Sequence, residues 1–348
     1  MWQRSHPRKH GDLYLADIKG PFLIGKEQYV IFACIDDISR IVWAEILPKN
    51  YVRYIPWALT RCYQALGGAP RDQKLDNGIG LIRSGHLTLG PTVQTAFNLG
   101  TECIIYVPEG EPERNGKIEA FNNTLQQEFI SENKLAEQTI DEARKALAAF
   151  IHTYNTNRPH SSLQHEEPCK HGTYQQLDVK APRTSKVKAE RYGTLAYWRR
   201  IDGRGIAQNR VTSECYELDP HVAGNYCEIA INWATMEGTV TVDRKVIGKF
   251  NHKDSGTKVN GVRWIKVNLD PEAVELTSGP KRFDEEAYTR QMTKRLKRKV
   301  AEYPKGLAVK HTPDGCILLD AETGEIYAMP ESLNADHLTD IDVFTEYL

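Results

Sequence analysis

The sequence lacks the features of a membrane protein, of a secreted disulfide-bonded protein and of a cysteine-based zinc protein. No apolar run approaches the roughly 18 residues that suggest a membrane span, and residues 1–17 carry charge without an apolar signal-peptide core. The seven cysteines are scattered, odd in number and never arranged as a CxxC pair. That pattern argues against a disulfide framework and against a cysteine zinc site. We therefore expect a protein of the reducing cytoplasm that makes no membrane contact.

A large net charge is also missing, because 45 Lys and Arg residues are balanced by 46 Asp and Glu residues. The charges are nevertheless segregated along the chain. Residues 173–211 carry a net charge of +6, residues 281–310 carry +6, and residues 311–348 carry −9. Two basic segments indicate a polyanionic partner, and the acidic tail indicates a possible competitor for the same surface. Ordinary solvated faces are the alternative interpretation.

The first half of the chain alternates between patterns typical of strands and of helices. Strands are expected at 12–20, 28–40, 41–48, 74–78 and 101–107, and helices at 52–66, 92–100, 113–132 and 137–156. Three antiparallel strands followed by strands that alternate with helices predict an α/β fold, with a mixed five-stranded sheet flanked by helices. At roughly 100–200 residues per domain, the 348 residues allow two or three domains.

The pattern changes after this predicted core, which we assign to residues 1–172. Residues 173–192 are polar and basic, as expected of a linker. Residues 193–252 consist of short alternating segments separated by Gly, Asn and Asp, which predict a small all-β barrel. Residues 253–348 form a predicted C-terminal extension. It contains a basic helix at 281–303, a hairpin around the Ala-Glu-Thr-Gly stretch and an acidic end.

Three acidic residues stand out by their positions in this pattern. We place Asp17 at the end of the first strand, Asp76 at the end of the fourth, and Glu119 on the helix after the fifth. Neighbouring strand ends and a crossing helix would bring the three carboxylates together. Crowded carboxylates repel one another unless a cation joins them, and Mg²⁺ prefers oxygen ligands. Taken singly, each acid is better explained as a turn residue or a helix-start carboxylate.

Several phrases, in order, carry a family resemblance. They are LADIKG, YVIFACIDDISRIVWAEIL, LDNG, PEGEPERNGKIEAFNNTLQQEF and YNTNRPHSSLQHEEP. Over about residues 10–170 the chain resembles the catalytic core of DDE transposases and integrases. The resemblance is greatest to bacterial insertion-sequence and Mu-type transposases, and retroviral integrases are more distant. Residues 193–252 resemble the small barrel that follows the core in Mu-like transposases.

The resemblance implies an RNase H-like fold and a metal site that binds two Mg²⁺ ions, with Mn²⁺ as a substitute. It assigns Asp17, Asp76 and Glu119 as the catalytic acids and metal ligands. It also implies hydrolysis that frees 3′-hydroxyl ends of a mobile element, followed by their direct transfer into target DNA. Paired ions suit this chemistry because they can activate a nucleophile and stabilise the leaving oxygen.

The resemblance and the charge pattern together predict DNA contacts near the acids and in the C-terminal parts. The predicted residues are Arg114, Asn115, Lys117, Asn123, Gln126, Arg158, His160, Arg199, Arg200, Arg204, Lys294 and Lys297. Tyr197 and Trp198 are expected to add an aromatic surface among the arginines. The alternatives are a solvated helix face for the amides, a packed structural role for His160, and arginines that are simply exposed.

The expected partners are transposon-end DNA, target DNA and further copies of the chain in a synaptic complex. Related enzymes usually carry helix-turn-helix domains before the core, but only about ten residues precede the first strand here. End recognition would then belong to a separate subunit, to the C-terminal parts, or to a segment missing from a fragment. The leading hypothesis is a DNA transposase or integrase in the bacterial cytoplasm, associated with the nucleoid. A catalytically silent DNA-binding or assembly subunit is the alternative, and an RNase H-type nuclease is a weaker one.

Overall fold

A computed structural model describes residues 7–75, 89–106, 115–184, 186–209, 212–259 and 261–279, and strands within 307–327. The chain divides into two compact units, residues 1–281 and residues 282–348. None of the helices in the described ranges is long and apolar enough to cross a membrane.

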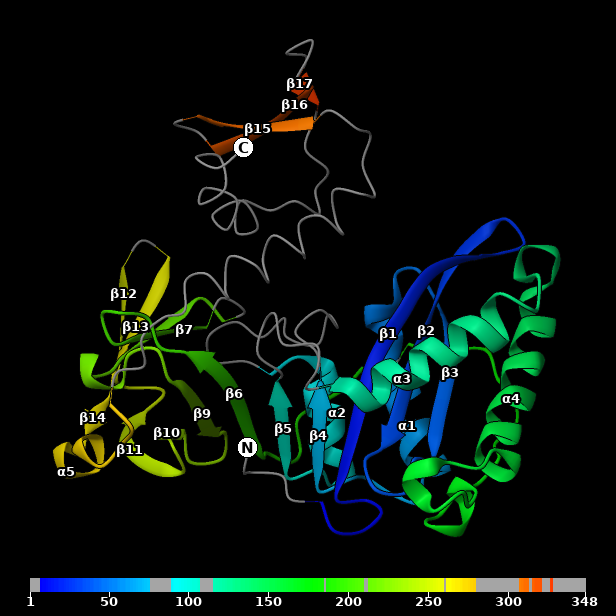
Figure 1. Cartoon of the computed structure of the whole chain (residues 1–348), viewed down its shortest axis with the longest axis horizontal. Coiled ribbons are helices and arrows are strands. Elements are labelled where there is room, and N and C mark those ends of the chain that lie inside the picture. Colours follow the sequence, from blue (N-terminus) through cyan, green and yellow to red (C-terminus); the bar gives the residue numbers. More distant parts are fainter. Residues whose placement is uncertain are drawn as a thin grey trace. The chain divides into compact units, whose positions relative to one another are not determined.

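A mixed sheet forms the centre of the first unit (Figure 1). Its first five strands are β1 (Leu13–Ile24), β2 (Glu27–Asp36), β3 (Val42–Pro48), β4 (Asp72–Leu75) and β5 (Cys103–Tyr106). β1, β2 and β3 pair antiparallel, whereas β4 runs parallel to β1 and β5 parallel to β4. The spatial order β3-β2-β1-β4-β5 confirms the predicted mixed sheet.

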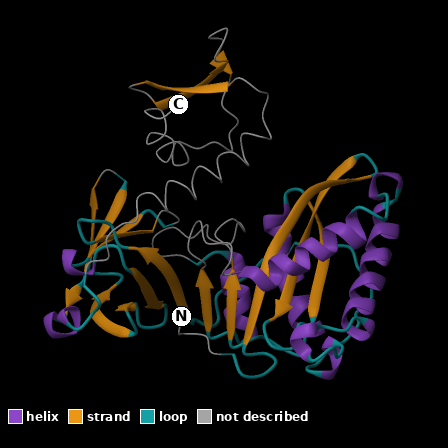
Figure 2. Cartoon of the chain, viewed as in Figure 1, coloured by secondary structure: helices purple, strands orange, loops and turns teal. Residues whose placement is uncertain are grey.

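Helices cover both faces of this sheet (Figure 2). They are α1 (Ile55–Ala65), α2 (Pro91–Leu99), α3 (Gly116–Thr124) with its π-helical continuation η3 (Leu125–Ile130), and α4 (Ile140–Asn157). Successive residues of β1 face opposite sides of the sheet. Tyr14 and Ala16 belong to the apolar core shared with α1 and α2, whereas Leu13 and Leu15 belong to the core under α3 and α4. The alternation therefore directs position 17 toward the α3 side.

Local signals account for several helix ends. Pro56 lies in the first turn of α1, where a missing amide donor does no harm. α2 ends at Gly100, whose φ of +115° favours glycine. Thr139 and Glu142 form a reciprocal capping box at the start of α4. These ends agree with the helices predicted from the sequence.

The sheet continues beyond β5 into the second half of the first unit. β6 (Thr194–Arg200) pairs parallel to β5, and it is followed in space by β9 (Tyr226–Asn232), β10 (Glu237–Val242), β11 (Lys245–Asn251) and β14 (Asn268–Leu269). The described sheet thus has ten strands, whereas the sequence predicted a five-stranded sheet and a separate barrel. All four residues of β5 are buried, and Tyr106 stacks on Tyr197 of β6 with ring centroids 5.0 Å apart.

A second sheet of four strands completes what we call the β module, residues 193–279. It consists of β12 (Gly256–Val259), β13 (Val262–Lys266), β8 (Glu214–Glu217) and β7 (Ile206–Asn209) in spatial order. The predicted all-β character from residue 193 is confirmed, with a short helix α5 (Pro271–Glu275) at its end. The module extends past the predicted boundary at residue 252, because β13 pairs with β8 and β14 pairs with β11.

The second unit contains a small antiparallel sheet of β15 (Leu307–Thr312), β16 (Gly315–Asp320) and β17 (Ile326–Tyr327). Its β16–β17 pair confirms the predicted hairpin. The predicted basic helix at 281–303 and most of the acidic end lie outside the described residues.

Candidate active site

Asp17 lies on β1, but not at the end of the strand as the sequence suggested. β1 spans twelve residues, and Asp17 is followed by seven more, five of which pair with β2 in a hairpin whose register shifts between Lys19 and Phe22. The prediction was wrong because alternation shows that a segment is extended but not how far a hairpin continues. The last described pair between β1 and β4 joins Ala16 and Leu75, and Asp17 directly follows Ala16.

Asp76 follows Leu75, the last residue of β4, in the sequence. The sequence analysis expects Asp76 at the end of the fourth strand, and the structure describes this strand as far as Leu75. Asp76 itself lies outside the described residues, as does Arg114, so the position of either side chain stays a prediction.

Helix α3 crosses the sheet on the side toward which Asp17 is directed (Figure 1). Ile118, Phe121 and Leu125 are buried in the core under this helix. Asn122 lies beside them, and its side-chain nitrogen Nδ2 donates a hydrogen bond to Asp17 Oδ2 at 2.7 Å. The other oxygen of Asp17, Oδ1, accepts from the Ile18 amide at 2.8 Å. The structure thus joins α3 directly to the predicted catalytic aspartate.

Glu119 lies in the first turn of α3 and is half-buried. Residues three apart on a helix are neighbours on its surface, so Glu119 lies one turn before Asn122. The contact between Asn122 and Asp17 therefore brings the glutamate-bearing face of α3 to the part of β1 that holds Asp17. The sequence predicted this face, but it did not predict that Asn122 would hold the aspartate. The spacing of Glu119 and Asn122 is the signal that could have indicated it.

The start of α3 is attached to the turn between β2 and β3. Lys117 Nζ lies 2.6 Å from Asp37 Oδ2 and also donates to the Asp37 carbonyl oxygen at 3.0 Å. Asn115, at the N-cap position, is 7% exposed and makes no side-chain cap. Asn123 is exposed and Gln126 is half-buried. Of the four polar residues predicted to contact DNA from this helix, Lys117 thus has an acidic partner inside the chain.

The residues present suit a hard divalent cation. Carboxylate oxygens are the ligands that Mg²⁺ accepts, and Asp17 offers one from β1 while Glu119 offers another from α3. Two amide oxygens nearby, Asn115 Oδ1 and Asn122 Oδ1, are buried and accept no hydrogen bond from the described residues. No group of three possible metal ligands occurs within the described ranges, which exclude Asp76.

Asp36 lies at the end of β2, where the chain turns toward β3. Asp36 is fully buried, and it accepts hydrogen bonds from the amides of Gly11, Ile38 and Ser39. Burial opposes its ionisation, but these hydrogen bonds and the contact with His10 outweigh burial and lower the pKa of Asp36. The carboxylate thus organises the turn.

Arg158 and His160 follow α4 and pack against it. Arg158 Nη1 lies 2.6 Å from Glu128 Oε2, and its guanidinium lies over the Tyr154 ring. His160 packs edge-on to the same ring with centroids 5.0 Å apart. Burial, together with the charges of Arg158 and Arg40, lowers the pKa of His160. These contacts agree with the packed role that was the alternative for His160, while DNA contacts by either residue stay predictions.

The arginines of the β module differ in exposure. Arg199 is 6% exposed, and its Nη2 donates to Asn209 Oδ1 at 2.7 Å, so its guanidinium belongs to the interior. Arg200 is half-buried, and the exposed Arg204 pairs with Asp202 at 2.9 Å. The expectation of an aromatic surface is wrong for Tyr197, which is buried against Tyr106. Lys294 and Lys297 lie outside the described residues.

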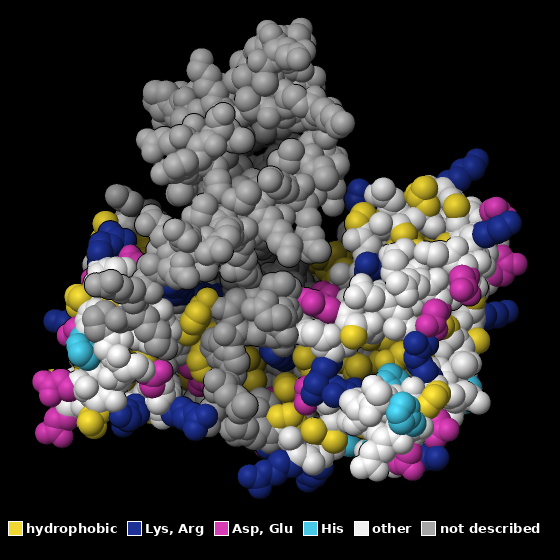
Figure 3. Space-filling view, in the orientation of Figure 1, with side chains coloured by type: hydrophobic (Ala, Val, Ile, Leu, Met, Phe, Trp, Pro, Cys, Tyr) yellow, Lys and Arg dark blue, Asp and Glu magenta, His cyan; other side chains and the backbone are white. Residues whose placement is uncertain are grey.

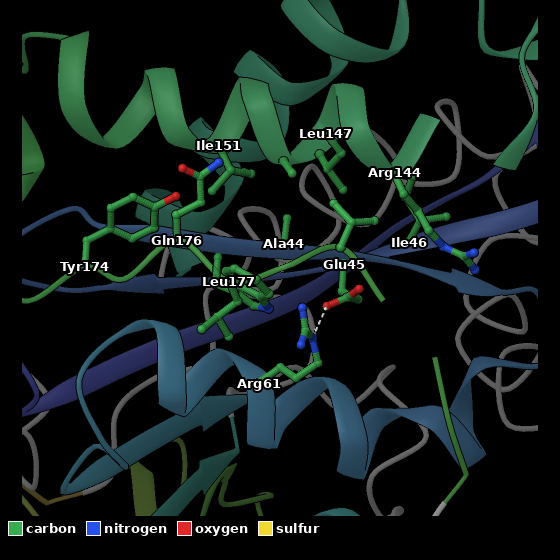
Figure 4. Close-up of a pocket in the computed structure, with 13 residues that line it drawn as sticks. Ala44, Glu45, Ile46, Arg61, Arg144, Leu147, Ile151, Tyr174, Gln176 and Leu177 are labelled. Atoms are coloured by element: carbon green, nitrogen blue, oxygen red, sulfur yellow. Dashed lines mark hydrogen bonds and ion pairs between the residues drawn. The ribbon is translucent and has the colours of Figure 1, made fainter. Parts of the chain in front are cut away.

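A small pocket of about 30 Å³ lies between α1, α4 and β3 (Figure 4). Its lining is largely apolar. The polar side chains in it are Arg144, Gln176 and the buried ion pair of Glu45 and Arg61, whose atoms Oε2 and Nε lie 3.2 Å apart. Burial raises the pKa of Glu45 to about 7, although the nearby Arg61 guanidinium opposes this rise. Neither Asp17 nor Glu119 lines this pocket, so we assign it to the core rather than to the site.

Part of the chain matches a known protein family. Residues 102–168, which include Glu119, match the family described as an integrase core domain. The chain is also 32% identical over 76 residues to the insertion element IS407 uncharacterized 31.7 kDa protein of Burkholderia multivorans. That match covers 22% of this chain and 27% of the length of the relative. These two findings confirm the predicted resemblance to transposases and integrases.

Solved integrase structures also resemble the chain. One is a chain of the simian T-cell lymphotropic virus intasome in complex with PP2A regulatory subunit B56 gamma. It has 16% identity and a TM-score of 0.40, and the match covers 67% of this chain and 81% of that one. Another is the HTLV-2 integrase catalytic core domain in complex with magnesium. It has 17% identity and a TM-score of 0.34, over 47% of this chain and 97% of that one.

Proposed function

We propose that this chain is a DDE-type DNA transposase or integrase that joins the 3′ ends of a mobile element to target DNA. The observation that carries the proposal is the hydrogen bond between Asn122 and Asp17. It holds the helix that bears Glu119, which lies in the segment that matches an integrase core domain, against the strand that bears Asp17. β4 leads toward Asp76 directly beside β1.

In the proposed mechanism, Asp17, Asp76 and Glu119 hold a pair of Mg²⁺ ions. When bound, such ions activate a water or a 3′-hydroxyl and stabilise the leaving oxygen of the phosphodiester. Asn122 keeps the Asp17 carboxylate oriented by donating to Oδ2, and the backbone amide of Ile18 holds Oδ1. The protein thus contributes ligands whose orientation is set before DNA arrives.

The proposed DNA surface combines α3 and the linker. Asn123 and Gln126 offer amides beside the site on the exposed side of the helix. The linker is held to α2 by Asn98, whose amide donates to the Lys188 carbonyl and accepts from the amides of Glu190 and Arg191. The linker carries five exposed cations, and none of them forms an ion pair with another described residue. They are Lys180, Arg183, Lys186, Lys188 and Arg191.

Unpaired cations of this kind suit contacts with DNA phosphates, which position a duplex without reading its sequence. Basic and acidic side chains both occur on the face of the first unit in Figure 3, so its surface is mixed rather than uniformly basic. We propose that the chain works as a homo-oligomer on two DNA ends.

The test is a strand-transfer assay with pre-cut duplexes that carry candidate element ends. The wild-type chain should join them to target DNA in Mg²⁺ or Mn²⁺. Asp17→Asn, Asp76→Asn and Glu119→Gln should each lose at least about 100-fold in rate, because each removes a charge that the metal site requires. Glu132→Gln, a change at an exposed glutamate of the loop after η3, is the matched control and should keep wild-type activity.

Full activity in Asp17→Asn or Glu119→Gln would refute the proposed site. A wild-type chain that binds the duplexes tightly but never joins them, in either metal, would favour a silent DNA-binding subunit instead.

A further inference from the structure

The ion pair between Lys117 and Asp37 connects the active-site helix to the sheet at a second point. Lys117 lies in the first turn of α3, two residues before Glu119. Asp37 directly follows β2, and its backbone amide donates to the Leu13 carbonyl at the start of β1 at 2.9 Å. The lysine therefore holds the helix to a turn that is itself hydrogen-bonded to the strand of Asp17.

The two polar contacts of α3 lie on opposite flanks of its buried face. At roughly 100° per residue, Ile118, Phe121 and Leu125 define the side that faces the core. Lys117 projects from one flank of this side, whereas Asn122 and then Glu119 project from the other. A roll of the helix in either direction would therefore stretch one of the two contacts.

The helix needs this local control because its geometry changes just after the site. α3 ends at Thr124, and residues 125–130 continue as a π-helix. π-helical turns occur mostly as single insertions, frequently at functional sites. The position of η3 therefore does not determine how the first turn of α3 is rotated about the helix axis.

We propose that the Lys117–Asp37 pair is a positioning device that fixes the rotation of α3, so that Glu119 is held toward the metal site. This inference rests on the proposed function. The lysine is a positioning residue rather than a DNA contact, because its ammonium group already binds both the carboxylate and the carbonyl oxygen of Asp37. The side chains are 37% and 12% exposed, so the pair is partly shielded from solvent.

The experiment compares Lys117→Met, Asp37→Asn and the charge-swapped double variant Asp37→Lys/Lys117→Asp with the wild-type chain. Lys145→Met, which removes an exposed lysine on α4, is the matched control. Each protein is assayed for the Mg²⁺ concentration that gives half-maximal strand transfer, and for DNA affinity as a function of salt. Hydrogen exchange of the α3 amides is measured in parallel without metal or DNA.

Both single variants should raise the half-maximal Mg²⁺ concentration by about 10-fold, as the loss of a group that supports a metal ligand commonly does. DNA affinity and its salt dependence should stay unchanged. Exchange of the α3 amides should accelerate in both, with α4 unaffected, and the charge-swapped variant should recover part of each loss. Lys145→Met should match the wild-type chain.

The opposite pattern would overturn the inference. If Lys117→Met weakens DNA binding and lowers the salt slope by about 1 while Asp37→Asn changes nothing, the lysine is a DNA contact. Unchanged exchange of the α3 amides in both single variants would also overturn it. If the wild-type chain transfers no strands, the proposed function fails, and the exchange measurement still decides whether the pair holds the helix.

Discussion

Replacing Asn122 by alanine should separate the stability of the fold from the competence of the site. The substitution removes the Nδ2 donor that lies 2.7 Å from Asp17 Oδ2. A hydrogen bond to a charged group is worth about 1.5–3 kcal/mol. The same substitution removes Asn122 Oδ1, which is buried and without a partner among the described residues. An unsatisfied buried acceptor costs about 1–3 kcal/mol.

These two contributions oppose each other, so the free energy of unfolding should change by no more than about 2 kcal/mol. The Asp17 carboxylate, however, loses the group that orients it. Loss of such an outer partner typically costs about 10–100-fold in metal affinity or activity. Asn122→Ala should therefore fold normally and transfer strands about 10–100-fold more slowly at limiting Mg²⁺.

The measurement pairs urea denaturation with strand transfer over a range of Mg²⁺ concentrations. Gln127→Ala, at an exposed position of η3, is the matched control and should behave as the wild-type chain in both assays. Wild-type rates and metal dependence in Asn122→Ala would refute the orienting role. A loss of more than about 3 kcal/mol of stability would show that the residue acts on the fold instead.

Two further predictions concern the folded scaffold. Burial raises the pKa of Glu45 to about 7 from its ordinary 4.5. The folded chain therefore binds the proton of this carboxyl group more tightly than the unfolded chain does. As a result, the contribution of Glu45 to the free energy of unfolding falls as the pH rises from 4.5 to about 7. Arg61→Met removes the cation that pairs with Glu45, so at pH 8 the free energy of unfolding, measured by urea denaturation, should fall by about 3–5 kcal/mol. At pH 5, where the Glu45 carboxyl group is protonated, the loss should be clearly smaller. Equal losses at the two pH values would contradict this prediction. Gly193→Ala should lower the free energy of unfolding by about 1–3 kcal/mol. The added Cβ would lie 2.5 Å from the Glu102 carbonyl oxygen and from the Phe97 ring. An unchanged midpoint of urea denaturation would contradict this tight packing.

The elements of the core were predictable because their signals are local. Alternation, capping residues and turn glycines indicated the five strands and the helices of residues 12–157, and the phrase NGKIEAFNNTL directed attention to α3. The all-β character after residue 193 was equally visible. These features depend on neighbours within a few positions along the chain.

The remaining features depend on contacts between distant segments. The pairing of β5 with β6 joins residues 103 and 194. The hydrophobic periodicity of a strand does not indicate which other strand will pair with it at the edge of a sheet. Charge alone cannot distinguish a lysine that binds DNA from one that binds Asp37, nor an exposed arginine from the buried Arg199. The strand of Asp17 is a separate case, because alternation shows that it is extended but not how far its hairpin with β2 continues.

The central claim is that Asp17, Asp76 and Glu119 together hold the metal ions of a strand-transfer site. Its most direct test is anomalous diffraction from crystals of the chain grown with Mn²⁺ and a pre-cut DNA end. We predict manganese peaks coordinated by carboxylate oxygens of all three residues, with Asn122 still bound to Asp17. Manganese bound elsewhere, or absent from Asp17 at saturating concentration, would contradict the account.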